Sequence, residues 1–141
     1  MKRISFNTRF VNEAGNDLKS GKIHTIRQNY EYWKKYEGQE VALFTWEGKP
    51  YRSKQKVFCV KRIACVQMVY LRRVADGLLG KENGVLSFRI YDKWIQLNSQ
   101  LAENDGFVDK DGILDTEGFL NWFKDYKSGK MAILHFTDFR Y

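Results

Sequence analysis

The chain has 141 residues, of which 43% are hydrophobic and 16% aromatic, and its formal net charge at pH 7 is +7. This apolar content excludes an intrinsically disordered chain, and the length suits a single domain over residues 1–141 with its own core. No apolar run approaches the length of a membrane span, and residues 1–5 (MKRIS) are not followed by an apolar targeting stretch. We therefore expect a cytoplasmic domain that does not contact a membrane.

The charge is unevenly distributed along the chain. Residues 48–73 contain no acidic side chain but eight basic ones: Lys49, Arg52, Lys54, Lys56, Lys61, Arg62, Arg72 and Arg73. From residue 101 to residue 141, eight acidic side chains outnumber five basic ones. A basic half beside an acidic half favours a surface that binds a polyanion such as RNA, although many basic domains bind no nucleic acid.

The cysteine and histidine content predicts neither a disulfide nor a metal site. Cys59 and Cys65 lie in one extended region, too far apart for a local bridge, so we interpret both as reduced thiols of the core. Two cysteines and two histidines at scattered positions do not have the ligand spacing of a zinc site. No metal ion and no cofactor are therefore predicted.

Hydrophobic periodicity and turn residues predict the elements of the N-terminal region. Residues 3–6 alternate as a short strand, and residues 8–20 are typical of a helix that ends at Gly21. The apolar side of this helix would carry Phe10, Val11, Ala14 and Leu18.

The rest of the chain predicts further strands and helices. Residues 30–36 favour a short helix and residues 39–46 a strand, which a turn at 47–50 follows. Residues 54–71 are too many for one strand, which indicates two strands or one strand bent at a bulge near Arg62. The remaining predicted elements are a loop at 77–84, a strand at 87–92, a helix from 98 or 99 to about 106, a helix from 115 or 116 to 126, and a final strand at 131–136. Five or six strands mixed with about three short helices favour a small α+β barrel.

The stretch 21–27 (GKIHTIR) does not have the pattern of an ordinary half-buried strand. Alternation mixes polar and apolar groups on both of its sides, with Lys22, His24 and Ile26 on one side and Ile23, Thr25 and Arg27 on the other. Two cations, a hydroxyl and an imidazole are costly to bury unless a ligand or a partner satisfies them at the edge of a cleft. The other interpretation is a plain loop-to-strand transition whose Lys and Arg are solvated.

A second polar segment, 101–107 (LAENDGF), precedes the aromatic helix predicted around 117–123 (EGFLNWF). Between them, residues 109–112 (DKDG) resemble the start of a calcium-binding loop. Ile113 stands where the next ligand belongs, and no suitably placed Glu follows. We interpret residues 109–112 as a solvated turn.

The pattern Gly21-Lys22-x-x-Thr25-x-Arg27 after a predicted N-terminal helix resembles the signature of ASCH domains (activating signal cointegrator homology), a branch of the PUA-like fold. The acid-Gly-Phe step at Asp105, the aromatic helix after it and the closing strand at 132–136 are similar to elements of the same family. Together these elements span nearly the whole chain. The resemblance implies a PUA-like mixed β-barrel with a basic cleft that binds RNA, nucleotides or modified nucleosides.

One branch of this family removes the acetyl group from N4-acetylcytidine with a Lys, a Thr and a Glu. The motif match places the first two roles at Lys22 and Thr25, and the carboxylate falls at Asp105, which is one methylene shorter than Glu. The resemblance therefore implies these three residues as catalytic candidates. To them we add four ligand-binding candidates from the same two segments: Gly21, His24, Arg27 and Glu103.

Such a set of residues has a coherent chemistry. A Thr hydroxyl needs a base to take its proton, and a second cation such as Arg27 would move the pKa of Lys22 toward neutrality. Asp105 would orient Lys22 or accept from the amino group of a base; alternatively, it forms a structural ion pair with Lys22 or Arg27. We therefore predict a binding cleft first and an amidohydrolase of N4-acetylcytidine-like nucleosides as the alternative, with interaction with another protein third.

Overall fold

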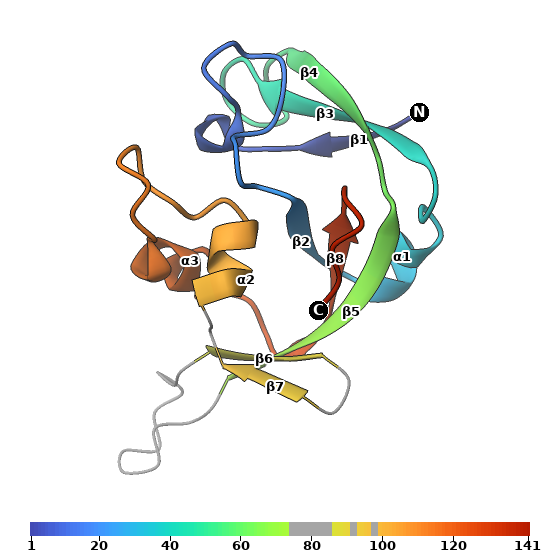
Figure 1. Cartoon of the computed structure of the whole chain (residues 1–141). Helices are drawn as coiled ribbons and strands as arrows, with labels where there is room; N and C mark the ends of the chain where they lie inside the picture. The colour runs from blue at the N-terminus through green and yellow to red at the C-terminus, as the bar shows by residue number, and fades with distance from the viewer. Residues whose placement is uncertain (74–85, 91–92, 97–98) are drawn as a thin grey trace.

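The computed structural model describes residues 1–73, 86–90, 93–96 and 99–141, and in this part of the chain eight strands form two sheets. The smaller sheet has the order β1-β3-β4 and consists of β1 (Lys2–Ser5), β3 (Glu40–Trp46) and β4 (Gln55–Arg62). β1 runs parallel to β3, and β3 is antiparallel to β4. This sheet occupies the upper part of Figure 1.

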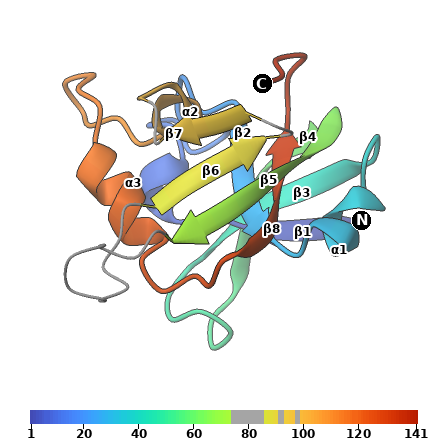
Figure 2. The ribbon, with the colours of Figure 1, turned by 90° about the horizontal axis from the view of Figure 1, so that it is seen from below.

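The larger sheet has the order β2-β8-β5-β6-β7, and all neighbouring strands in it are antiparallel. Its strands are β2 (His24–Gln28), β8 (Gly129–His135), β5 (Cys65–Arg73), β6 (Leu86–Ile90) and β7 (Lys93–Gln96). Figure 2 shows β8 and β5 side by side in its middle. Residues 131–135 of β8 are all buried, as expected for a strand covered on both faces. β2 lies at the edge of this sheet.

The chain passes from one sheet to the other between two consecutive residues. The Ile63 amide donates to the Gln39 carbonyl at 2.9 Å, next to the smaller sheet. The Ala64 amide donates to the His135 carbonyl at 2.8 Å, within the larger one. The predicted interruption near Arg62 is confirmed, and its effect is that β4 and β5 belong to different sheets.

The α+β class is confirmed, but the predicted number of five to six strands is wrong, since eight are present among the described residues. One reason is that residues 86–96 contain the hairpin β6–β7, in which Ser87 pairs with Gln96, where a single strand was predicted. The described ladders leave both sheets open and do not close into a barrel.

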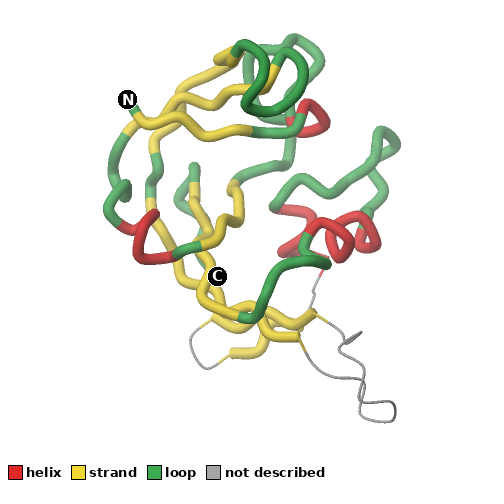
Figure 3. The backbone as a smooth tube through the Cα atoms, turned by 180° about the vertical axis from the view of Figure 1, so that it is seen from behind, coloured by secondary structure: helices red, strands yellow, loops and turns green. Residues whose placement is uncertain are grey.

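The three α-helices are short: α1 (Tyr30–Lys34), α2 (Ser99–Asn104) and α3 (Thr116–Trp122). Figure 3 shows α2 and α3 together on one side of the sheets and α1 apart from them. Within the described ranges, no helix has the length and apolar character to cross a membrane. The loop predicted at 77–84 lies outside the described residues.

The helix predicted over residues 8–20 is wrong. Only a 3-10 turn, η1 (Thr8–Phe10), forms there, and a loop follows in which Val11 and Leu18 face each other in a β-bridge. The Asn12 carboxamide oxygen accepts from the amides of Asn16 and Asp17, at 3.0 and 3.2 Å. Such side-chain-to-backbone bonds compete with helical ones, and Gly15 adopts a φ of 72° that no right-handed helix contains.

A cluster of aromatic rings holds the helices against the larger sheet. Phe107 and Phe119 have ring centroids 5.2 Å apart, and Phe119 and Phe88 5.6 Å apart, and these three side chains are fully buried. Rings of this size dominate core energetics, and edge-to-face pairs add to their burial. Phe107 follows the end of α2, Phe119 belongs to α3 and Phe88 belongs to β6. Their contacts therefore fix the end of α2, and with it Asp105, relative to the larger sheet.

Two smaller predictions concern single side chains. The Asp109 carboxylate accepts from the amides of Asp111 and Ile113, both at 2.9 Å, so it caps its own turn, in agreement with the turn predicted there. Cys59 and Cys65 are free thiols, and both are only partly buried, so neither belongs to the fully buried core in which they were predicted; Cys59 packs against its edge. Burial raises the pKa of the Cys59 thiol.

Candidate functional site

A pocket of about 280 Å³ opens between β1 of the smaller sheet, β2 of the larger sheet and the α2–α3 region. Segments far apart in the sequence contribute to its walls, from the loop after β1 to the residues after α3. The lining residues are Ser5, Phe6, Asn7, Phe10, Lys22, Thr25, Ile26, Arg27, Trp46, Pro50, Tyr51, Asp105, Phe107, Trp122 and Tyr126. We call this hollow the aromatic pocket. Lys22, Thr25, Arg27 and Asp105, all singled out from the sequence, line it together.

Lys22 lies in the turn before β2, and its side chain is only 2% exposed. Its ammonium donates to the Asp105 carbonyl at 2.6 Å and to Asp105 Oδ1 at 3.1 Å. The same nitrogen lies 4.4 Å from the centroid of the Phe10 ring, a cation–π distance. Burial lowers the pKa of Lys22; Asp105 opposes this shift, and Arg27 and Arg9 add to it through charge repulsion.

Asp105 follows the last turn of α2, and its carboxylate is 5% exposed. The next residue, Gly106, has a φ of 89°, and a Cβ built there would lie 3.0 Å from Lys22 Cδ. Glycine is required for both reasons, since other residues rarely adopt this φ and a side chain would displace Lys22. The Asp-Gly step therefore lets the α2 end close onto the lysine stem.

Thr25 and Arg27 project from β2 on the pocket side. Arg27 Nε donates to Thr25 Oγ1 at 3.2 Å, and Arg27 Nη2 donates to the Ser5 carbonyl at 2.6 Å. Its guanidinium carbon lies 4.9 Å from the centroid of the Phe6 ring. Burial lowers the pKa of Arg27, with the Asp105 charge acting in the opposite direction. Arg27 thus links β2 to the end of β1 through neutral partners.

His24 lies behind the pocket, where it is fully buried and supports Asp105. Its Nδ1 is 3.3 Å from Asp105 Oδ1, and its Nε2 is 2.6 Å from the Tyr141 hydroxyl. Because an ionised carboxylate only accepts, Nδ1 carries the proton and Nε2 accepts from Tyr141. The Asn104 side chain donates to the same hydroxyl at 3.1 Å. Burial lowers the pKa of His24 and raises that of Tyr141, which keeps both groups neutral at pH 7.

The predicted sides of the 21–27 stretch need one correction. Alternation placed Lys22 and Thr25 on opposite sides, but both line the aromatic pocket. The reason is that β2 begins at His24, so Lys22 belongs to the preceding turn and not to the alternating strand.

The remaining ligand-binding candidates lie outside the pocket lining. Gly21 and Glu103 are exposed, and His24 faces the buried network. Sequence reasoning missed most of the walls, which are aromatic: Trp46, Tyr51, Phe107, Trp122 and Tyr126. Phe107 and Trp122 lie in the two segments that the sequence analysis singled out, but for Trp46, Tyr51 and Tyr126 the available signal was the aromatic content of 16%, which identifies no position.

A scan against protein-family models gives no match, and neither does a search of curated proteins or of solved structures. The function must therefore be argued from the geometry of the pocket and from the chemistry of its residues.

Gly106→Ala should destabilise the fold more than Gly21→Ala does. Both glycines have a φ of 89°, but a Cβ at Gly21 would meet nothing within 4 Å. The shared backbone strain costs about 1 kcal/mol, and the clash with Lys22 adds about 1–3 kcal/mol at Gly106 alone. Urea unfolding measures both losses. Equal losses would show that Gly106 does not hold the lysine stem in place.

Stability should fall as the pH drops from about 7 toward 5, a range in which ordinary carboxylates barely titrate. Burial lowers the pKa of His24 and lowers that of His135 to about 3, so the folded state binds fewer protons than the unfolded one below pH 6.5. Each imidazole then contributes a slope of about 1 kcal/mol per pH unit. His135→Gln should remove roughly half of this slope in melts at several pH values. An unchanged slope would contradict a neutral His135.

Proposed function

We propose that this domain binds single-stranded RNA, nucleotides or modified nucleosides, and that the aromatic pocket receives one base. The observation that carries the proposal is the convergence of Lys22, Thr25, Arg27 and Asp105 in a hollow walled by aromatic rings. Aromatic faces stack on any base, and a few fixed polar groups can then read its edge. Pockets for small ligands have this composition in general.

The polar groups suit a base that carries both an amino group and a carbonyl. Among the described residues, both side-chain hydrogen bonds to Asp105 reach Oδ1, which leaves Oδ2 to accept from an exocyclic amine. Carboxylates accept from the N4 amine of cytosine in this way. The Thr25 hydroxyl lies in the same pocket and can donate to a carbonyl oxygen.

The charge around the pocket favours a polyanion. Pro50 and Tyr51 line the pocket from the loop between β3 and β4, and this loop also presents exposed cations: Lys49, Arg52 and Lys54. A local excess of positive charge attracts phosphates and speeds their encounter with the site.

The resemblance to ASCH domains points in the same direction. Its two motif segments, around Lys22 and around Asp105, meet at one hydrogen-bonded pair in this fold. We propose on this basis that the domain is a cytoplasmic ASCH relative of PUA-like architecture, in which the continuous passage from β4 to β5 joins the two halves of an incomplete barrel.

Hydrolysis of N4-acetylcytidine is the second candidate, because the pKa of Lys22 is lowered beside a buried Thr25. The Thr25 oxygen would attack the acetyl carbonyl while a neutral Lys22 takes the hydroxyl proton, and the C–N bond would break as that proton moves to the leaving amine. Water would then release acetate from the threonine ester. Two observations favour binding: the Lys22 ammonium is directed at Asp105, and Thr25 is bonded to Arg27.

Calorimetric titration with cytidine and with N4-acetylcytidine tests the binding proposal. Thr25→Val keeps the side-chain shape and should weaken nucleoside binding about 2- to 13-fold, because the ligand carbonyl loses one hydrogen bond of roughly 0.5–1.5 kcal/mol. Thr137→Val is the matched control, since Thr137 is exposed and does not line the pocket. If the wild type binds neither these nucleosides nor a short RNA, the proposal is wrong.

Chromatographic assay of N4-acetylcytidine separates the two candidates. We expect the wild-type protein to bind this nucleoside without releasing cytidine. If turnover occurs, Thr25→Val and Lys22→Met should each abolish it almost as completely as the double variant, because a nucleophile and its base act as a unit. Asp105→Glu restores the longer carboxylate, and turnover by this variant alone would identify a binding domain that lacks the chemistry by one methylene.

A further inference from the structure

A second hollow continues the aromatic pocket along the smaller sheet. It has a volume of about 470 Å³ and is lined by Lys2, Arg3, Ile4, Ser5, Arg27, Trp33, Phe44, Trp46, Tyr51 and Gln55. We call it the β1 groove, because all four residues of β1 line it. Four residues line both hollows: Ser5, Arg27, Trp46 and Tyr51. The pocket and the groove are therefore adjacent, with Arg27 at their junction.

Three cations line the β1 groove, and their contacts are with neutral groups. Lys2 donates to the Tyr32 hydroxyl, and its nitrogen lies 5.5 Å from the Trp33 ring centroid. Arg3 donates to the Gln55 side-chain oxygen at 3.0 Å. In the part of the chain that the structure describes, no carboxylate lies within ion-pair distance of Lys2, Arg3 or Arg27.

Of the three cations, Arg27 at the junction is the one whose charged form burial disfavours. The Arg27 guanidinium is partly buried, and its hydrogen bonds are to the Ser5 carbonyl and the Thr25 hydroxyl. A desolvated cation is costly unless a negative charge offsets it. Asp105 acts on Arg27 through its charge but forms no ion pair with it, and the bidentate geometry of guanidinium matches a phosphate. A phosphate at this point would neutralise Arg27 within a groove that Arg3 and Lys2 also line.

The aromatic residues of the groove suit a base beside that phosphate. Tyr51 is 89% exposed, and its ring lies 5.2 Å from that of Trp46. Its φ of 63° is uncommon for a residue with a bulky side chain, and residues in such conformations are frequent at ligand clamps. Trp33 forms another part of the groove wall. Base stacking on exposed rings is the usual source of sequence-tolerant affinity for single strands.

We propose that the aromatic pocket and the β1 groove are consecutive subsites for one single strand of nucleic acid. The first base enters the pocket, the phosphate that links it to its neighbour lies at Arg27, and the neighbouring base stacks in the groove between Trp33 and Tyr51. This inference rests on the proposed base-binding role of the pocket. It adds that the preferred ligand is a strand of at least two nucleotides and not a free nucleoside.

A ligand series of increasing length tests the inference on the full chain. Calorimetry would compare cytidine, cytidine 3′-monophosphate, cytidine 5′-monophosphate, the dinucleoside monophosphate CpC and an eight-residue oligocytidylate. We expect one of the two monophosphates to bind more tightly than cytidine, and CpC to bind at least about tenfold more tightly, because it adds a phosphate and a stacked base to the interaction. A tetraglutamate peptide serves as the alternative anion and should not bind.

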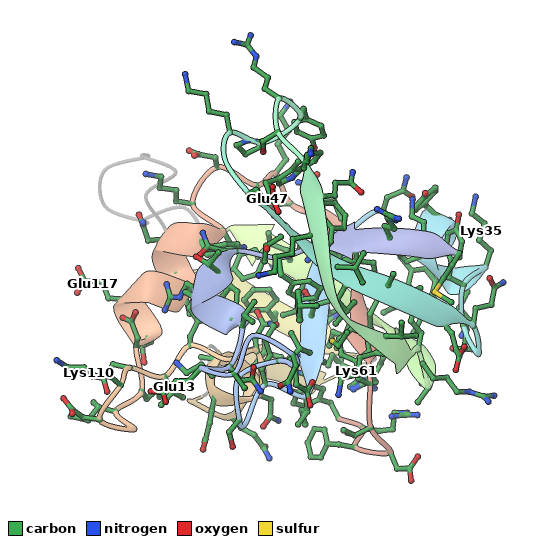
Figure 4. The ribbon with its side chains drawn as sticks, turned by 90° about the horizontal axis from the view of Figure 1, so that it is seen from above. Glu13, Lys35, Glu47, Lys61, Lys110 and Glu117 are labelled. Carbon is green, nitrogen blue, oxygen red and sulfur yellow. The ribbon has the colours of Figure 1, made fainter. Side chains whose placement is uncertain are left out.

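Substitutions of the groove cations test whether the higher affinity for CpC than for cytidine arises in the β1 groove. Arg3→Gln and Lys2→Met should weaken CpC about 3- to 10-fold and leave cytidine unchanged. With the eight-residue oligocytidylate, they should lower the slope of log affinity against log salt by about 0.7 for each phosphate that is no longer neutralised. Lys110→Gln is the matched control. Lys110 lies in the turn between α2 and α3 and lines neither hollow. Figure 4 shows it on the opposite side of the view from Lys35, which directly follows α1. Thermal melting checks that every variant is folded.

The outcomes separate the inference from the function on which it rests. If cytidine binds and neither a phosphate nor a second nucleotide increases affinity, the β1 groove is not a subsite, whereas the pocket keeps its proposed role. If neither cytidine nor any longer ligand binds, the proposed function fails and the inference fails with it. If tetraglutamate binds as tightly as CpC, the groove accepts acidic peptides and the nucleic-acid assignment is overturned.

Discussion

The site depends on the buried ion pair between Lys22 and Asp105, which joins the turn before β2 to the end of α2. Both side chains are nearly inaccessible to water, and removing two such charges from solvent costs several kcal/mol for each ion. The surroundings offset this cost with further hydrogen bonds. The Asp105 carbonyl accepts from the ammonium, His24 donates to the carboxylate, and the Phe10 ring covers the cation. Removing one partner alone would leave the other charge buried without compensation, so the pair requires the two segments to stay together.

This requirement explains the local features around the pair. Gly106 is needed because any Cβ there would meet the lysine stem, and the Phe107 ring beyond it anchors the segment in the aromatic cluster. On the far side, His24 and Tyr141 form a neutral, hydrogen-bonded support with one consistent set of donors. The pair therefore separates two environments. The buried polar network lies behind it, and the aromatic pocket opens in front of it.

Lys22 and Arg27 differ in whether a carboxylate is paired with their charge, and this difference separates the two candidate functions. Lys22 has a carboxylate partner, whereas Arg27 is bonded to neutral oxygens and faces two hollows. A compensated lysine suits a structural role better than that of a free general base. A guanidinium without an ion-pair partner, beside the exposed ring of Tyr51, suits a phosphate. The distribution of charge is thus one reason why we propose binding of a nucleic-acid strand ahead of hydrolysis of an acylated nucleoside.

The sequence alone determined the α+β class and most strand positions, because periodicity is a local property. The unusual polar stretch 21–27 pointed to Lys22, Thr25 and Arg27, whereas Asp105 became a candidate only through the resemblance to ASCH domains. The sequence did not determine where the chain changes sheets, and it predicted a helix at 8–20 where Asn12 instead bonds to its own loop. It offered the ion pair of Asp105 with Lys22 or Arg27 only as one alternative, without deciding which pair would form across 83 residues, and it did not predict which rings would wall the pocket. Those features depend on tertiary packing, because contacts between distant segments leave no periodic trace in either segment.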